Sequence, residues 1–397
     1  MPSYWKLKYV KPVSARRRII TNLEKVRKQL AEELPHKRAE ETLLLGTWNI
    51  RNFDDNRFGN GPRLDESLWY IAEVISAFDI LAVQEVCEDL GPLDKVMKLL
   101  DPAYEYIITD VTEGPGGNRE RLGFIYNRGK VNFKGVAGEI VLPYKDLISD
   151  VTKQRQFART PFCCSFQSRW FKFMFATVHI YYGKESKTSP QYKRRVKEIR
   201  SVSKFLAKRA KKEEYNYMLV GDFNIEDFEG ATFDALEEYG FKAVKNKTGS
   251  NSNQTKFYDQ ISFVPRPDEL QFANPNAPNQ CHGVFNFFKH LFTPAQLDDY
   301  KSVLKATLSA KIAETKKDLE KAKQKKVAAT TTETKKKWQK KIDGFNDSIA
   351  ENKKLRDTAA GMKQYYRQWR TYQLSDHMPL WVELRIDFST EYLRGLK

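Results

Sequence analysis

The stretch 217–224 constrains the fold most, because an apolar run ends there in a glycine and two polar side chains. The run is too short for a helix, so it predicts a buried strand that places Asp222 and Asn224 at the rim of a sheet. Aspartate and asparagine also form turns, so a strand followed by a plain Gly-Asp-Phe-Asn turn explains the same letters. The neighbours of these two side chains must therefore decide whether they are functional.

Other polar side chains follow apolar strands in the same way. The predicted strands are 42–50, 80–86, 121–127, 171–181, 256–264 and 378–386. In these strands, or within two residues of them, lie Asn49, Glu85, His179, Asp259, Asp376 and His377. Each has a structural explanation of its own, and a strand histidine is commonly a hydrogen-bonded core residue. So many polar groups converging in one sheet would be costly unless they form a site.

These residue types favour one kind of chemistry. Oxygen ligands without a cysteine cluster favour a hard cation, Mg²⁺ first, with Mn²⁺ or Ca²⁺ as alternatives. Such a cation, combined with carboxylates and imidazoles, suits the hydrolysis of a phosphate ester. The metal neutralises the non-bridging oxygens, a carboxylate orients or deprotonates water, and an imidazole assists proton transfer.

The distribution of charge indicates a polyanionic partner. The chain of 397 residues carries 68 Lys plus Arg against 51 Asp plus Glu, a net charge of +17. The surplus is concentrated in 1–40, 184–212 and 301–370, which leaves the remainder acidic. An acidic body with basic attachments suits a cation-binding centre that acts on nucleic acid or at an anionic membrane surface. Solubility alone is the other explanation.

Cysteine usage and hydropathy suggest a location. The four cysteines, Cys87, Cys163, Cys164 and Cys281, have no metal-ligand spacing, which predicts free thiols in a reducing compartment. The chain has no apolar signal segment near its N-terminus and no apolar run long enough to cross a bilayer. We therefore expect a cytoplasmic protein without a transmembrane segment, although a chain trimmed of its signal would look the same. Nothing in the sequence indicates the oligomeric state.

The segment between Asp259 and Asp376 predicts an inserted element. Apolar residues recur there at steps of three and four, interrupted by the polar linker 328–334. The pattern predicts an antiparallel helical hairpin whose second helix is weakened by Gly344 and Gly361. Its lysine-rich faces suit a solvated coiled-coil exterior or a nucleic-acid grip, and the hairpin could also recruit a protein partner. We expect a basic helical leader over 1–40, a sheet-and-helix domain over 41–293 and 371–397, and the hairpin over 294–370.

Six short motifs together resemble a known family. They are 48–53 (WNIRNF), 84–86 (QEV), 177–179 (TVH), 221–224 (GDFN), 258–261 (YDQI) and 375–379 (SDHMP). In this order they resemble the endonuclease/exonuclease/phosphatase superfamily, and within it the deoxyribonuclease I type. The resemblance covers about 43–384 apart from the hairpin. It implies an α/β fold, a four-layered sandwich of two packed β-sheets flanked by helices, with the helical hairpin inserted.

The resemblance also implies roles for the residues that hold the metal and the water. Glu85 would hold the cation with Asn49 nearby and Asp376 as a further ligand. Asp222 and Asn224 would position the nucleophilic water and the phosphate.

A second group would surround the scissile phosphate. The resemblance implies that His377, oriented by Asp259, and His179 flank the phosphate as acid, base or ligands. Glu120 would be the carboxylate partner of His179, and Arg159 would contact a phosphate.

Departures from the family pattern narrow the function. No acidic residue follows Asn49 closely, and a histidine stands at 179 where abasic-site endonucleases carry asparagine, which disfavours abasic-site repair. The segment after Glu85 lacks the arginine that deoxyribonuclease I inserts into the minor groove, and the usual disulfides and secretion signal are absent from the sequence. We predict a metal-dependent phosphodiesterase that cuts nucleic acid, in the first place a DNA endonuclease. The alternatives are a phosphatase or phosphodiesterase acting on a small phosphoester or lipid head group, and a binding protein with an idle site.

Overall fold

The computed structural model describes residues 2–37, 40–53, 56–113, 116–148, 156–266 and 269–396. Residues 1 and 38–39 of the predicted leader lie outside them. The chain forms two compact units, one of Met1–Asp55, Asp65–Phe287 and Leu374–Lys397, the other of Asn56–Leu64 and Phe288–Gln373. The division into leader, sheet-and-helix domain and hairpin stays a prediction.

Two six-stranded sheets form the first unit. The strands are β1 (Thr42–Phe53), β2 (Ile80–Val86), β3 (Tyr104–Ile108), β4 (Arg121–Asn127), β5 (Asn132–Glu139), β6 (Phe162–Ser168), β7 (Phe171–His179), β8 (Asn216–Asp222), β9 (Lys242–Ala243), β10 (Asp259–Phe263), β11 (His282–Val284) and β12 (Leu380–Arg385). The first sheet has the order β11-β12-β1-β2-β4-β3 and the second β5-β6-β7-β8-β10-β9. The pairs β1–β2 and β7–β8 are parallel within otherwise antiparallel ladders, so both sheets are mixed.

The main hydrophobic core lies between the two sheets. Leu45 of β1 and Phe124 of β4 belong to the same buried cluster as Phe175 of β7 and Val220 of β8. The rings of Phe124 and Phe175 have their centroids 5.0 Å apart, a distance typical of favourable aromatic pairs. Alternate side chains of β7 and β8 point to the opposite face and form a second core with α4 (Pro190–Ala210) and α5 (Ala231–Glu237).

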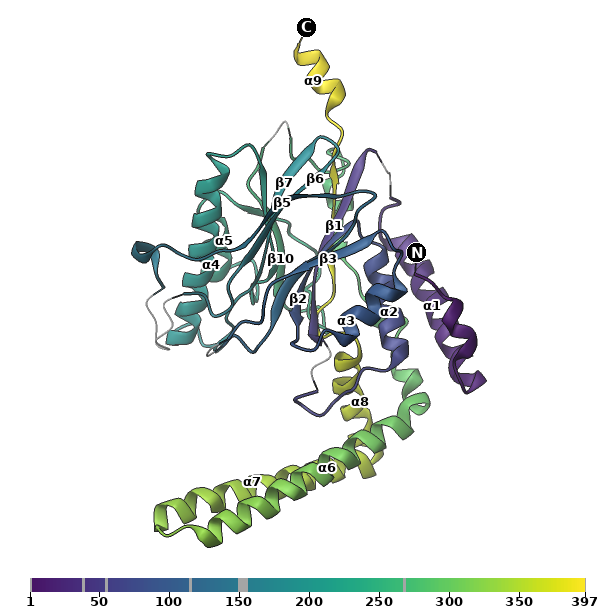
Figure 1. Cartoon of the computed structure of the whole chain (residues 1–397), viewed down its shortest axis with the longest axis vertical. Coiled ribbons are helices and arrows are strands. Elements are labelled where there is room, and N and C mark those ends of the chain that lie inside the picture. The colour runs from purple at the N-terminus through teal and green to yellow at the C-terminus, as the bar shows by residue number, and fades with distance from the viewer. Residues whose placement is uncertain are drawn as a thin grey trace. The chain divides into compact units, whose positions relative to one another are not determined.

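Helices cover the outer faces of both sheets. Figure 1 shows α4 and α5 on one side and α1 (Val13–Glu33), α2 (Asp65–Ser76) and α3 (Gly91–Leu99) on the other. The basic leader forms α1 and packs on α2, where Asn22 donates to the Tyr70 hydroxyl at 3.0 Å. A short α9 (Ser389–Gly395) follows β12. The predicted fold class, two packed sheets flanked by helices with an inserted hairpin, is therefore confirmed.

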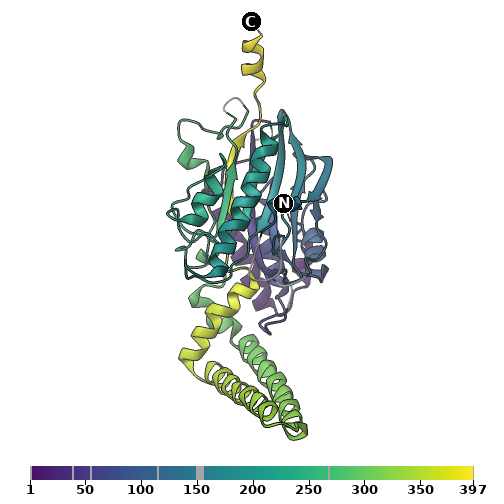
Figure 2. The same cartoon turned by 90° about the vertical axis from the view of Figure 1, so that its left-hand side faces the viewer.

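The second unit is the helical hairpin. Helices α6 (Leu297–Ala328) and α7 (Thr332–Asp357) run side by side in Figure 2 and share a core that includes Leu319 and Ile342. Helix α7 continues through Gly344, but Gly361 follows a break, so the predicted second helix is two helices, with α8 (Ala359–Gln373) as the next. The segment 56–64 joins this unit through Asn60, whose Oδ1 accepts from Lys311 Nζ at 3.0 Å. In the described part of the chain, no helix combines the length and apolarity needed to span a membrane.

Candidate active site

The register of the strands brings distant polar residues together. Because β7 and β8 are parallel, His179 lies beside Asp222, the last residue of β8. Strand β10 runs antiparallel on the other side of β8 and places Asp259 opposite the same aspartate. Three predicted site residues therefore lie in one row across the second sheet.

Asn49 links this row to the first sheet. Its Nδ2 lies 2.9 Å from Oε1 of Glu85 at the end of β2 and 3.0 Å from Oδ2 of Asp222. The hydroxyl of Ser375 donates to the backbone carbonyl of Asn49 at 2.6 Å and accepts from the backbone N–H of His377 at 3.0 Å. The two sheets thus contribute to one site, which Asn49 and Ser375 hold together.

His179 is oriented by a buried ion pair. Its Nδ1 lies 2.9 Å from Oε2 of Glu120, and Nε of Arg159 lies 2.8 Å from the same oxygen. Burial opposes ionisation of Glu120, but the nearby His179 and Arg159 outweigh it and lower the pKa of this carboxyl to about 2. Burial and Arg159 disfavour the imidazolium, yet Glu120 and Asp222 raise the pKa of His179 above its ordinary value. The ring is therefore held between two carboxylates.

His377 has an equivalent arrangement. Its Nδ1 lies 2.7 Å from Oδ2 of Asp259, which orients the ring. Its Nε2 then lies 3.8 Å from Oδ2 of Asp222, the oxygen that Nε2 of His179 approaches to 3.6 Å. Burial disfavours the charged ring, but Asp259 and Asp222 outweigh it and raise the pKa of His377 well above its ordinary value. Two imidazole rings thus face one carboxylate.

The residues around Glu85 fit a divalent cation. Ligand atoms of Glu85, Glu120 and His179 lie within 4.8 Å of one another, and Oδ1 of Asn49 is buried with no hydrogen-bond partner in the described residues. Burial and the negative charge of Glu120 raise the pKa of Glu85, so a cation would offset an unfavourable concentration of negative charge. Such oxygen-rich sets are those that hard cations prefer.

Asp376 and Asn224 contact groups of the protein that their predicted roles did not include. Asp376 pairs with Arg51 at 3.3 Å, and its side chain is 35% exposed. Asn224 adopts a φ of 53°, donates its backbone N–H to Oδ1 of Asp222 at 2.9 Å, and donates Nδ2 to the carbonyl of Ile180 at 2.8 Å. Metal binding by Asp376 and phosphate binding by Asn224 stay predictions, as do the roles of the other site residues.

Sequence reasoning missed a buried ion pair that positions the site. The side chains of Arg194 and Glu198 in α4 are 2% and 0% exposed, and Nε of Arg194 lies 2.8 Å from Oε1 of Glu198. The Glu198 carboxylate accepts the backbone N–H of Ala158, which precedes the predicted phosphate-binding arginine, and that of Tyr181, two residues after His179. Charged residues four apart among the apolar positions of a helix were the signal that could have revealed this pair.

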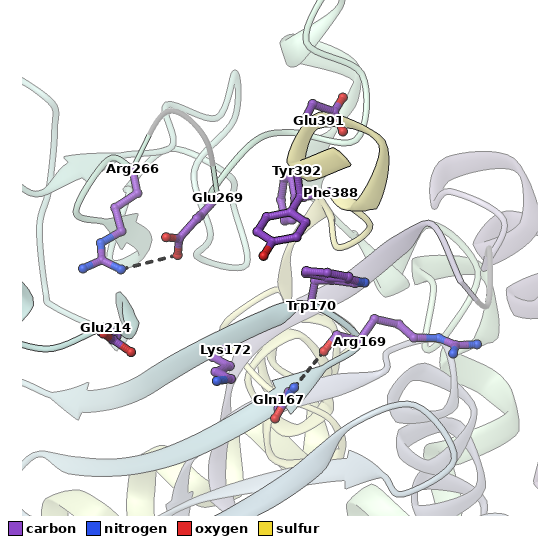
Figure 3. A pocket seen from close by; sticks show the side chains of 10 residues that line it. All are labelled: Gln167, Arg169, Trp170, Lys172, Glu214, Arg266, Glu269, Phe388, Glu391 and Tyr392. Carbon is purple, nitrogen blue, oxygen red and sulfur yellow. Dashed lines mark hydrogen bonds and ion pairs between the residues drawn. The ribbon is translucent and has the colours of Figure 1, made fainter. Parts of the chain in front are cut away.

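A cavity away from these residues has a different lining. It measures about 940 Å³ and lies beside the first residues of β7, whereas His179 is the last residue of this nine-residue strand. Figure 3 shows Trp170 beneath Tyr392 of α9 and Arg266 directed at Glu269, an ion pair of 3.4 Å. A strand of this length separates its ends by about 26 Å, so this cavity is not the candidate active site.

A family model matches the part of the chain that contains the site residues up to Asp259. The model of the endonuclease/exonuclease/phosphatase family matches residues 46–277, more than half of the chain. The match includes Asn49, Glu85, His179, Asp222 and Asp259 and ends before the hairpin. Comparison with curated proteins finds no significant match.

Solved structures show distant similarity. An endonuclease/exonuclease/phosphatase family protein from Bacteroides thetaiotaomicron is 18% identical, with 87% of this chain and 95% of that chain covered and a TM-score of 0.48. A mannosyl-6-phosphatase from the same organism is 21% identical, with coverage of 62% and 90% and a TM-score of 0.45. The catalytic domain of human Nocturnin is 12% identical, with coverage of 61% and 85% and a TM-score of 0.42. Because these scores are low, the assignment of the chain depends on the family model.

Proposed function

Because the chain belongs to the endonuclease/exonuclease/phosphatase family, whose members hydrolyse phosphoesters, we propose that it is a divalent-metal-dependent phosphodiesterase that cuts nucleic acid, as a DNA endonuclease of deoxyribonuclease I type. One observation carries the proposal. The Nε2 atoms of His179 and His377 lie 3.6 and 3.8 Å from the same oxygen of Asp222, and each ring has a further carboxylate at Nδ1. This arrangement supplies a base for water and protonated rings beside it.

The chain's own groups account for the proton transfers of hydrolysis. Asp222 orients the attacking water and takes its proton as the new phosphorus–oxygen bond forms. One of the imidazolium rings, His179 or His377, gives a proton to the leaving oxygen as the ester bond breaks. A divalent cation held by Glu85 and Asn49 would neutralise charge on the non-bridging oxygens of the phosphate.

The charge of the chain supports a polyanionic substrate. The chain has a net charge of +17, although its candidate site is rich in carboxylates, so the positive charge lies outside the site. A positive surface attracts nucleic acid through release of counterions from its backbone. A small phosphoester gains less from such a surface, because it carries few charges.

A panel of substrates tests the proposal. The protein is incubated with plasmid, linear duplex, single-stranded DNA, RNA and a small phosphodiester, each with Mg²⁺ and with chelator. We expect nicking of the plasmid with Mg²⁺ and none with chelator. Turnover of the small ester without any cleavage of nucleic acid would contradict the proposal and favour the phosphatase alternative.

A histidine variant tests the site itself. His179→Ala should lower the rate of DNA cleavage about 10²- to 10⁴-fold, the usual contribution of a general acid or base. His36→Ala is the matched control, because His36 is exposed and lies just after α1, outside the site. Equal activity of the two variants would remove His179 from the reaction.

A further inference from the structure

The hairpin carries its positive charge at one end. Residues 316–341, which span the end of α6, the connection and the start of α7, contain eleven lysines and three acidic residues. The remainder of 288–373 contains ten basic and seven acidic residues. The solvated surface of a helix normally carries positive and negative side chains in similar numbers. The remainder of 288–373 follows this rule, whereas the lysine-rich end, 316–341, does not.

The lysines of this end are largely uncompensated. Among the described residues, only Lys321 and Lys323 of the eleven have a carboxylate oxygen within 4.0 Å, those of Asp318 and Glu320. Lys335, Lys336 and Lys337 are exposed at the start of α7. Mutual repulsion of so many ammonium groups destabilises the hairpin, and nearby anions would relieve it.

The two helices contribute jointly. The ammonium groups of Lys325 on α6 and Lys341 on α7 lie 5.2 and 4.7 Å from the centre of the Trp338 ring. One aromatic ring thus contacts a cation from each helix. Lysines of both helices therefore contribute to one surface.

The chemistry of this surface points to a duplex backbone. All eleven basic side chains are lysines, which bind phosphates as point charges and carry little information about base sequence. Single-strand binders need exposed aromatic rings for stacking, whereas Trp338, the single aromatic residue of the segment, is partly buried. Helices that bind membranes need an apolar face, and the exposed large apolar side chain in 316–341 is Val327.

From these observations we propose that the lysine-rich end of the hairpin, residues 316–341, binds the phosphate backbone of double-stranded nucleic acid without sequence preference. The inference deepens the proposed nuclease function and rests on it for its biological role. The hairpin lies outside the residues that the family model matches, so this surface belongs to the present chain and is not implied by its family.

A pair of variants with equal net charge tests the inference in the full chain. One variant changes the lysine-rich end, residues 316–341, and is called the tip variant. It carries Lys335→Gln, Lys336→Gln, Lys337→Gln and Lys340→Gln. The control carries Lys305→Gln, Lys353→Gln, Lys354→Gln and Lys363→Gln, four exposed lysines of the hairpin outside 316–341. Both sets are combined with His179→Ala, and chelator is present, so that turnover does not disturb binding. Fluorescence anisotropy with a labelled duplex is measured from about 50 mM to about 200 mM salt.

The tip variant should bind the duplex at least tenfold more weakly than the parent at the lowest salt. The slope of log K against log salt should become shallower by about 3 to 4, since each lost phosphate contact contributes about 0.9. The control should stay within about twofold of the parent, as expected for residues without phosphate contacts. Circular dichroism checks that both variants keep their helices.

Three outcomes would overturn the inference. Equal weakening of both variants would mean that net charge alone matters, and unchanged binding by the tip variant would exclude the surface. Tighter binding to phosphatidylserine vesicles than to the duplex would assign it to a membrane instead. If the tip dependence is found but the wild-type chain never cleaves nucleic acid, the proposed function fails and the binding surface stands. If the chain cleaves DNA and the tip has no effect, only the binding surface fails.

Discussion

At the residue scale, the arginines of α4 show that a basic composition is not always a basic surface. The segment 184–212 contributes strongly to the positive charge of the sequence, yet Arg194 and Arg195 are buried. Arg195 donates to the backbone carbonyls of Tyr182 and Asn224, so its charge holds the loops beside the site. Part of the positive charge that was predicted to bind a polyanion is therefore buried and supports the fold.

Glu198→Gln tests this scaffold role. The change should lower the free energy of unfolding by about 3 to 5 kcal/mol, because it removes the carboxylate charge that pairs with the buried Arg194 guanidinium. Glu238→Gln is the matched control. Oε2 of Glu238 lies 2.7 Å from Nε of Arg200, which belongs to α4 as Arg194 does, and both side chains are more than 40% exposed. It should change the stability by less than about 1 kcal/mol. Urea denaturation that gives equal values for both variants would contradict the assignment.

The predictable part of the site follows one rule. Glu85 and Asp222 could be found because each ends an apolar strand, where an ionised carboxylate is unusual. Glu120 and Arg159 lie outside the strands and were found only through the family resemblance. Arg194, four residues before Glu198, was a signal of the ion pair in the sequence. The contacts of Glu198 with the backbone N–H groups of Ala158 and Tyr181 left none, because these partners are distant in the sequence and have no side-chain pattern.

At the element scale, the predicted strands lie close to observed ones, but the strands β3, β5, β6, β9 and β11 were not predicted. The predicted 80–86 and 121–127 coincide with β2 and β4. Strand β5 was missed because every residue of it is exposed and it contains Gly135 and Gly138, so it has no alternation. Strand β9 has two residues, too few for any periodicity. Pairing with neighbours, which the sequence does not display, defines these edge strands.

The end of β8 depends on a glycine that allows close packing. Gly221 has a φ of +126°, and a Cβ there would lie 2.2 Å from the carbonyl oxygen of Val178 in β7. Gly221→Ala should destabilise the protein by more than about 4 kcal/mol, because the clash adds to the backbone strain.

Gly240→Ala separates these two contributions. Gly240 has a φ of +104°, and a Cβ added there would have no atom of the described residues within 4 Å, so alanine should cost only about 1 to 3 kcal/mol of backbone strain. Thermal and urea unfolding of both variants give the comparison. Equal losses would mean that β8 packs less closely on Val178 than the structure shows.

At the scale of the whole molecule, the site depends on the packing of the two sheets. Asn49 and Glu85 come from the first sheet, and His179, Asp222 and Asp259 come from the second. Any cation bound at the carboxylates is therefore bound by the folded state and stabilises it.

A metal titration tests this coupling without measuring activity. Mg²⁺ or Mn²⁺ at about 100 times its dissociation constant should stabilise the wild-type protein by about 2.7 kcal/mol. Glu85→Gln should remove most of this gain, whereas Glu105→Gln, a change in β3 at a side chain that is 45% exposed, should keep it. A metal-dependent shift in thermal unfolding that is the same in both variants would place the cation elsewhere.

The most direct test of the central claim is the rate at which supercoiled plasmid is nicked with Mg²⁺ by wild type, Asp222→Asn and Asp234→Asn. Asp222 faces both histidines, whereas Asp234 is exposed on α5. We predict that Asp222→Asn lowers the rate at least about 10²-fold while its folded structure persists, and that Asp234→Asn matches the wild type. Nicking by Asp222→Asn at nearly the wild-type rate, from a folded protein, would contradict the claim that this carboxylate and its two imidazoles form the hydrolytic centre.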